Sequence, residues 1–226
     1  MDQIEITKHL FQKKVTCPVC NNIFKVNVVK VNSPRILSKD SDFLLRYSII
    51  NPYFYDVWIC NNCGYAALKA DFDKLRSHQK DVVLNKIKPK WKPRTYPDVL
   101  TEKLAIERYK LALLNAVVIE FKESTKAIIC LKIAWMYRLL EMKKEELHFI
   151  AQALAGFNDA YINESFPMYG LQRDSTMYLI GELNRKLGNN EEALIWYSKT
   201  ITTLGASYKI KDLARNGKDA IKSTNV

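Results

Sequence analysis

Apolar side chains recur at helical spacing through the second half of the chain. Residues three and four positions apart lie on one face of a helix, so this pattern predicts amphipathic helices that pack against one another. Pro167 and Gly170 interrupt the pattern in the middle, and Gly188 interrupts it again. The predicted helices cover about 99–121, 124–140, 143–162, 171–187, 190–204 and 207–222.

The first part of the chain has a different pattern. The stretches KKVTCPVC, FKVNVVKV and NPYFYDVWIC are rich in β-branched and aromatic residues, which is typical of short strands. After Gly64, Phe72, Leu75 and Val82 return to near-helical spacing, so we expect a helix to about Asn85. The prediction is an α+β protein with a small β head, similar to a zinc ribbon, and an all-α tail.

The two parts are joined by a basic, proline-containing segment, residues 86–97. Pro89, Pro93 and Pro97 each remove a backbone donor and disfavour helix in the residue before them. We therefore expect a semi-rigid extended linker. The predicted domains are a zinc-ribbon-like head with an insertion at 1–85, a linker at 86–97 and a helical domain at 98–226.

One stretch of the tail resembles a tetratricopeptide (TPR) repeat. Ile180 with Gly181, then Gly188, Ala193 and Tyr197, fall where that repeat uses small and aromatic residues to pack two antiparallel helices. A weaker copy includes Ala134, which lies 47 positions before Gly181 rather than 34. The tail is predicted to be TPR-like, and an ordinary antiparallel helical bundle remains the alternative.

Four of the five cysteines form two C-x-x-C pairs, Cys17 with Cys20 and Cys60 with Cys63. Each such turn directs two sulfur atoms at one ion, and two turns complete the tetrahedral shell that structural Zn²⁺ prefers. We predict one structural zinc ion on these four residues. The alternative is two separate thiol pairs, one of them redox-active.

Catalytic metal chemistry is disfavoured, because four cysteines fill the shell and leave no position for water. Asp40, Asp42 and Asp56 form a possible second metal site, although salt-bridged carboxylates in a loop are the simpler interpretation. The fifth cysteine, Cys130, lies in an apolar run and is expected to be buried and inert rather than reactive.

Thiol pairs of this kind suit a reducing compartment, and the longest apolar stretch is too short to span a bilayer. We expect a cytoplasmic protein with no membrane partner.

The formal net charge of +11 is unevenly distributed. Residues 1–97 carry 17 Lys and Arg against 8 Asp and Glu, whereas residues 98–226 carry 18 against 16. The segment 86–97 contributes five basic residues with no acid, close to an aromatic side chain that could stack on a base. The candidate nucleic-acid-binding residues are Lys86, Lys88, Lys90, Trp91, Lys92 and Arg94.

The motifs CPVC, SKDSDF and NPYFYDVWICNNCGYA, followed by a TPR-like tail, resemble an uncharacterised bacterial family, the domain of unknown function numbered 2225. The resemblance covers nearly the whole chain. It implies a cytoplasmic location and metal binding by paired cysteines, and it brings no reaction or substrate.

Three classes of function follow from these features. The leading hypothesis is a non-enzymatic zinc-binding protein whose helical tail binds a protein partner. The second is binding of single-stranded RNA or DNA by the basic segment and the head. An enzyme is third, since the sequence has no nucleophile with a base and no phosphate-binding glycine loop.

Overall fold

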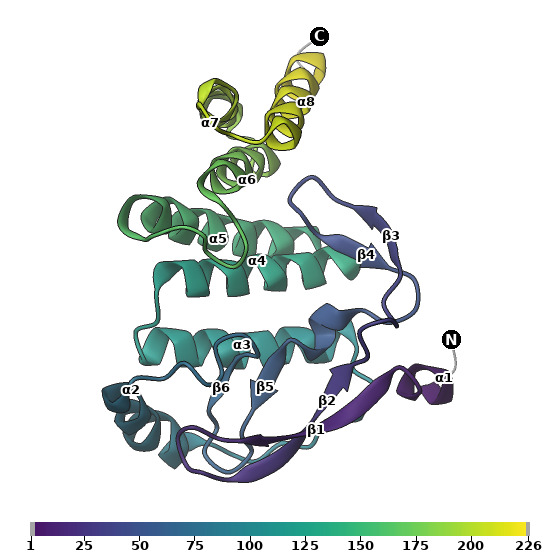
Figure 1. Cartoon of the computed structure of the whole chain (residues 1–226), viewed down its shortest axis with the longest axis vertical. Helices are drawn as coiled ribbons and strands as arrows, with labels where there is room; N and C mark the ends of the chain where they lie inside the picture. The colour runs from purple at the N-terminus through teal and green to yellow at the C-terminus, as the bar shows by residue number, and fades with distance from the viewer. Residues whose placement is uncertain (1–2, 225–226) are drawn as a thin grey trace. The chain divides into compact units, whose positions relative to one another are not determined.

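The structure is a computed structural model that describes residues 3–224. Short antiparallel strand pairs come first along the chain and longer helices follow (Figure 1). The predicted α+β class is therefore confirmed.

The strands form separate two-stranded sheets, each antiparallel. They are β1 (Leu10–Thr16) with β2 (Ile23–Val29), β3 (Ile36–Lys39) with β4 (Leu45–Tyr47), and β5 (Val57–Ile59) with β6 (Ala66–Leu68). The turn of the first pair contains Cys17 and Cys20, and the turn of the third contains Cys60 and Cys63. Each C-x-x-C motif thus joins two paired strands, which fixes the positions of its sulfur atoms.

Short helical segments lie around these strands. They are α1 (Gln3–Thr7), the 3-10 helix η1 (Pro52–Tyr55), α2 (Ser77–Val82), the π-helical turn η2 (Val83–Ile87) and the 3-10 turn η3 (Lys88–Lys90). The helix predicted to end near Asn85 therefore continues in helical form to Lys90. Buried Val83 and Ile87 pack into the core around the cysteines. This burial stabilises the extra turns although Pro89 disfavours helix in the residue before it.

The longer helices match the sequence prediction to within a few residues at each end. They are α3 (Glu102–Val118), α4 (Glu123–Leu139), α5 (Lys143–Asn163), α6 (Arg173–Lys186), α7 (Asn190–Thr202) and α8 (Tyr208–Thr224). Gly188, with a φ of 84°, directly follows the end of α6 as the sequence pattern indicated.

The chain forms two compact units. The first comprises Met1–Lys39, Leu45–Phe121 and Trp135–Met142, and the second comprises Asp40–Leu44, Lys122–Ala134 and Lys143–Val226. This division differs from the predicted boundary at residues 86–97, because the basic segment and α3 both belong to the cysteine-bearing unit.

Hydrogen bonds explain why α3 joins the first unit. Tyr109 donates to the backbone oxygen of Tyr53 at 2.6 Å, and Asn115 donates from Nδ2 to the oxygen of Gly64 at 3.3 Å. Both Tyr109 and Asn115 are buried. The short strand pairs cannot enclose a core by themselves, and α3 supplies the missing apolar face.

In the second unit, consecutive helices from α5 to α8 contact each other, and α6 also contacts α8. Tyr197 lies at the centre of this arrangement. A methyl group added to Gly181 would approach its Cδ1 to 2.9 Å, and one added to Gly217 would approach its Cζ to 2.5 Å. The glycines therefore allow α6 and α8 to approach the ring closely.

Candidate metal centre

The first cysteine pair lies in the turn between β1 and β2. The backbone N–H of Cys17 donates to the oxygen of Asn22 at 2.9 Å, and the N–H of Asn21 donates to the oxygen of Cys17 at 3.0 Å. Asn21 has a φ of 57°, in the left-handed region that asparagine tolerates better than most residues. The chain therefore reverses tightly around Cys17 and Cys20.

The second pair repeats this geometry at the same sequence offsets. The N–H of Cys60 donates to the oxygen of Tyr65 at 2.8 Å, and the N–H of Gly64 donates to the oxygen of Cys60 at 2.8 Å. Gly64 has a φ of 76° and occupies the position equivalent to Asn21. The two turns are thus equivalent structures formed by different sequences.

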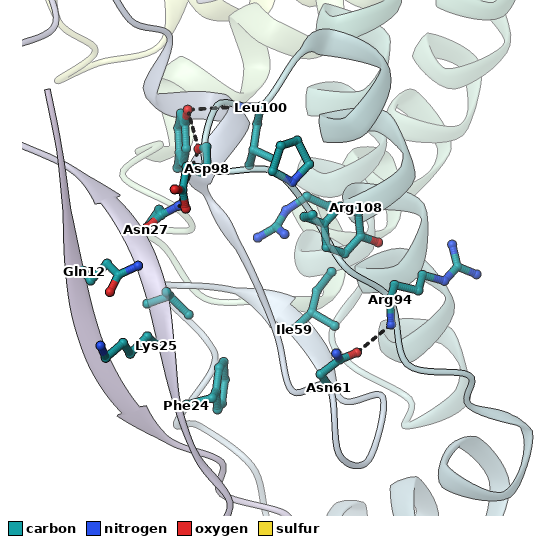
Figure 2. Close-up of a pocket in the computed structure, with 14 residues that line it drawn as sticks. Gln12, Phe24, Lys25, Asn27, Ile59, Asn61, Arg94, Asp98, Leu100 and Arg108 are labelled. Atoms are coloured by element: carbon teal, nitrogen blue, oxygen red, sulfur yellow. Dashed lines mark hydrogen bonds between the residues drawn. The ribbon is translucent and has the colours of Figure 1, made fainter. Parts of the chain in front are cut away.

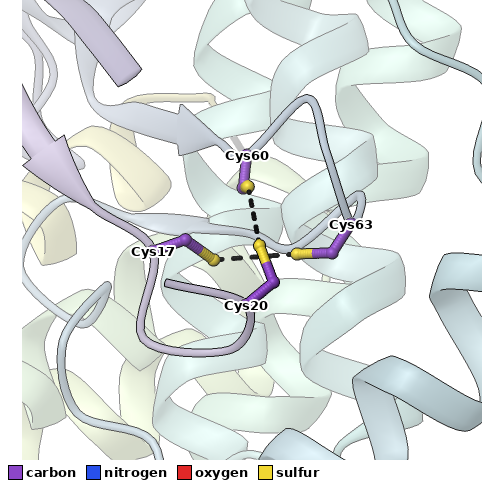
Figure 3. A group of neighbouring side chains, drawn as sticks. All are labelled: Cys17, Cys20, Cys60 and Cys63. Atoms are coloured by element: carbon purple, nitrogen blue, oxygen red, sulfur yellow. Dashed lines mark hydrogen bonds between the residues drawn. The ribbon is translucent and has the colours of Figure 1, made fainter. Parts of the chain in front are cut away.

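The four sulfur atoms converge between these turns (Figure 3). Sγ of Cys17 lies 3.6 Å from Sγ of Cys63, and Sγ of Cys20 lies 3.6 Å from Sγ of Cys60. All four sulfur atoms lie within 4.8 Å of one another. A tetrahedron of sulfurs at about 2.3 Å from a central ion has edges of about 3.8 Å, so the arrangement fits one four-coordinate metal ion.

The same distances exclude a disulfide, which needs about 2.05 Å between sulfurs, and all four cysteines are free. Cys17, Cys60 and Cys63 are fully buried, and Cys20 is partly exposed. The redox-pair alternative is disfavoured because each sulfur contacts a sulfur of the other turn at 3.6 Å and all four form one cluster.

The close contacts drive the thiol pKa values apart. Hydrogen bonds from Cys17 and Cys63 lower the pKa of Cys60 to about 2. The hydrogen bond to Cys60 raises the pKa of Cys17 to about 12, and contact with Cys17 raises the pKa of Cys63. One thiolate is therefore stabilised by the protons of the neighbouring thiols. Four thiolates together would need a bound cation in place of those protons.

An apolar core surrounds the cysteine cluster. Phe72 is fully buried, and its ring centroid lies 4.9 Å from that of Tyr65 and 5.6 Å from that of Trp58. Tyr65 donates its hydroxyl to the oxygen of Phe72 at 3.1 Å. This core shields three of the four sulfurs from water.

Two contacts to the site come from residues that the sequence did not single out. Asn62 donates from Nδ2 to Sγ of Cys20 at 3.4 Å, linking the two turns and supplying a donor to the partly exposed sulfur. Asn115 on α3 binds the oxygen of Gly64. No local sequence motif predicts either contact, because each joins two residues that are far apart in the sequence.

The segment predicted as a semi-rigid extended linker is attached to the second turn. Trp91 donates from Nε1 to the oxygen of Asn61 at 2.9 Å, and its ring lies against Gly64. The N–H of Arg94 donates to Oδ1 of Asn61 at 2.8 Å, and its side chain forms an ion pair with Glu107. Two independent hydrogen bonds thus hold residues 91–94 on the cysteine-bearing unit.

The predicted nucleic-acid-binding residues are separated by these contacts into two groups. Trp91 and Arg94 are engaged within the protein. The four lysines at positions 86, 88, 90 and 92 are exposed, and none takes part in an ion pair within residues 3–224.

Asp56, one member of the possible second metal site, forms an ion pair with Lys69 at 3.6 Å. Across residues 3–224, the four cysteines are the one group of three or more His, Cys, Asp or Glu residues placed to share a metal ion. The acidic residues between the cysteine pairs are therefore not brought together as a second metal site.

Comparison with known proteins identifies the family of this chain. The family described as "Uncharacterized protein conserved in bacteria (DUF2225)" matches residues 10–221. The chain belongs to this family. The resemblance recognised from the cysteine motifs is therefore confirmed, and DUF2225 covers both the cysteine cluster and the helices that follow it.

A protein of Borreliella burgdorferi named "Uncharacterized protein" is 26% identical to this DUF2225 chain over 153 residues. The match covers 60% of this chain and 54% of that protein, so the chain spans about half the length of its relative. No solved structure matches the chain. No helix within residues 3–224 is both long and apolar enough to cross a membrane.

Proposed function

We propose that Cys17, Cys20, Cys60 and Cys63 hold one structural Zn²⁺ ion and that the helices of the second unit bind a protein partner, without catalysis. The convergence of four sulfurs from two equivalent turns is the observation that supports metal binding most directly. A cytoplasmic location is part of the proposal, because a reducing compartment keeps such thiols available for metal.

Zinc is the preferred ion because tetrahedral thiolate sites of this kind commonly hold it, and a filled shell suits a structural role. A single iron would accept the same ligands. Bound iron absorbs visible light and bound zinc does not, so a spectrum together with elemental analysis separates the two ions.

The first test is metal content. Protein purified without chelator should contain about one zinc per chain. Cys60→Ser should lose the zinc and unfold the first unit, including α3, while α5 to α8 keep their helical circular dichroism, since they belong to the second unit. Cys130→Ala is the matched control and should keep the metal. Metal-free parent protein with a folded first unit would refute the proposal.

The helical unit is supported as an interaction surface by a cluster of aromatic rings and cations. The ring centroid of Tyr161 lies 5.2 Å from that of Trp196, and Nζ of Lys199 lies 4.8 Å from each ring centroid. Arg173 lies over the rings of Tyr161 and Phe166. Lys199 and Arg173 are exposed. Trp, Tyr and Arg side chains are enriched at protein-binding hot spots, and this cluster contains all three.

The test compares two charge reversals of equal size. Lys199→Glu with Arg173→Glu should abolish capture of partner proteins from lysate, and the capture by the parent should survive nuclease treatment. Lys209→Glu with Lys222→Glu, at two exposed positions of α8, is the control and should retain the partners. Equal retention by both variants would remove this surface from the proposal.

Nucleic-acid binding by the basic segment is the second candidate. It is supported by the exposed lysines at positions 86, 88, 90 and 92. It is weakened because Trp91 packs on Gly64 and Tyr96 donates its hydroxyl to Glu107 at 2.9 Å, so neither ring is free to stack on a base.

A further inference from the structure

A cavity of about 250 Å³ lies in the cysteine-bearing unit, beside β2, β5 and the start of α3 (Figure 2). All of its walls come from this one unit. Its lining mixes charged and amide groups with aromatic and aliphatic side chains. The residues that matter here are the polar Lys25, Asn27 and Arg108 and the largely apolar Tyr55, Tyr96 and Leu100.

Arg108 is the central polar residue of the lining. Its Nη2 donates to the backbone oxygen of Val57, and its guanidinium carbon lies 4.9 Å from the ring centroid of Tyr96. Its Nε is buried and has no acceptor. A guanidinium has five N–H donors, and within residues 3–224 that of Arg108 is matched to one backbone oxygen.

The charge of Arg108 is not balanced by a carboxylate at ion-pair distance within the described part of the chain. Glu107 is engaged by Arg94 and by the hydroxyl of Tyr96. Asp98, which also lines the cavity, accepts from Nδ2 of Asn27 at 2.8 Å. Glu107 and Asp98 are therefore hydrogen-bonded to other partners.

A guanidinium N–H that is buried without an acceptor, as Nε of Arg108 is, is costly. Desolvation lowers the pKa of Arg108, in agreement with this arrangement. An oxyanion accepts two parallel N–H bonds from a guanidinium and would offset the cost. The apolar side chains in the same lining would favour an organic body attached to that oxyanion.

We propose that this cavity binds a small organic anion, with its carboxylate or phosphate held by Arg108 and its apolar part against Tyr55, Tyr96 and Leu100. Lys25 adds a further positive charge to the same lining. Such binding adds to the proposed metal and partner sites and depends on neither.

The experiment titrates the full chain, as purified without chelator, with matched probes. Benzoate and benzamide have nearly the same shape, and benzoate carries the charge. Benzoate should bind with a dissociation constant below about 1 mM and at least roughly tenfold tighter than benzamide. Phenyl phosphate should also bind, and tighter than inorganic phosphate, because the phosphate ion lacks the apolar part.

Variants then assign the site. Arg108→Gln should reduce benzoate affinity by roughly tenfold, to the level of benzamide, and Arg108→Lys should show a smaller loss because it keeps the charge without the planar fork. Lys14→Gln is the matched charge control, since Lys14 pairs with Lys25 in the hairpin but does not line the cavity. It should bind benzoate as the parent does.

Equal binding of benzoate and benzamide by the parent would overturn the proposal, as would the absence of saturable binding by both anions. Unchanged affinity in Arg108→Gln would also overturn it and leave Arg108 as a support for Val57 and Tyr96. If Arg108→Gln does not fold, the Arg108→Lys titration decides, and parent-like benzoate affinity in that variant would refute the role of the guanidinium.

Discussion

Replacing Gly64 by alanine tests whether the basic segment is part of the cysteine-bearing unit. Gly64 has a φ of 76°, and a Cβ atom there would lie 2.7 Å from Cγ and Cδ2 of Trp91. The left-handed conformation costs about 1–2 kcal/mol with a side chain present. Displacing the ring adds about 1–3 kcal/mol, so Gly64→Ala should lower the free energy of unfolding of this unit by roughly 2–5 kcal/mol.

Asn21→Ala provides a matched control at the equivalent position of the first turn. Asn21 has a φ of 57° and is exposed. Its replacement should cost about 1 kcal/mol, which is the conformational part alone. Trp91→Ala combined with Gly64→Ala removes the collision, so the double variant should be more stable than the sum of the single effects by about 1–3 kcal/mol.

The assay is guanidinium unfolding at a fixed free zinc concentration, followed by the NMR signals of Ala66 and Ala67. Both alanines are buried in β6 and report on the first unit. The free zinc concentration must be fixed because bound metal itself adds to stability. Equal effects of Gly64→Ala and Asn21→Ala, with no coupling to Trp91, would refute the packing of this segment on the second turn.

Glu182→Gln should destabilise the second unit at pH 7. Burial raises the pKa of Glu182, but hydrogen bonds from Arg185, Ser41 and Tyr197 outweigh burial and hold the pKa below its usual value. This stabilisation is present above the unfolded pKa of about 4.3 and is lost as pH falls through the lower folded pKa, so the stabilities of parent and variant should converge in acid. A stability difference that grows below about pH 4 would contradict the lowered pKa. Cys130 should resist iodoacetamide at pH 8 in the folded chain, since burial raises its pKa to about 12, and mass spectrometry of the labelled peptide measures this. Changing the four exposed lysines of the basic segment to Gln should leave partner capture intact; sub-micromolar, salt-sensitive binding of single-stranded RNA by the parent, lost in this variant, would favour the nucleic-acid function instead. The substituted residues are Lys86, Lys88, Lys90 and Lys92.

Local sequence determines much of this protein. Each C-x-x-C turn is specified by the cysteine spacing and by a residue that tolerates positive φ, Asn21 in one case and Gly64 in the other. Helix positions from α3 to α8 were predictable because their periodicity and their glycine and proline breaks involve neighbouring residues. That the two cysteine pairs lie close together was predictable because two pairs supply the four ligands of one ion.

The tertiary structure decided the features that depend on residues far apart in the chain. Trp91 packs on Gly64, Asn115 binds the oxygen of Gly64, and Arg108 binds the oxygen of Val57 across 51 positions. The prolines and charge of residues 86–97 predict a semi-rigid extended linker when read locally, whereas contacts with Asn61, Gly64 and Glu107 attach the segment to the cysteine-bearing unit. Local propensity acts over a few residues, whereas a core forms wherever folding brings complementary surfaces together, and that pairing has no signature in either segment alone.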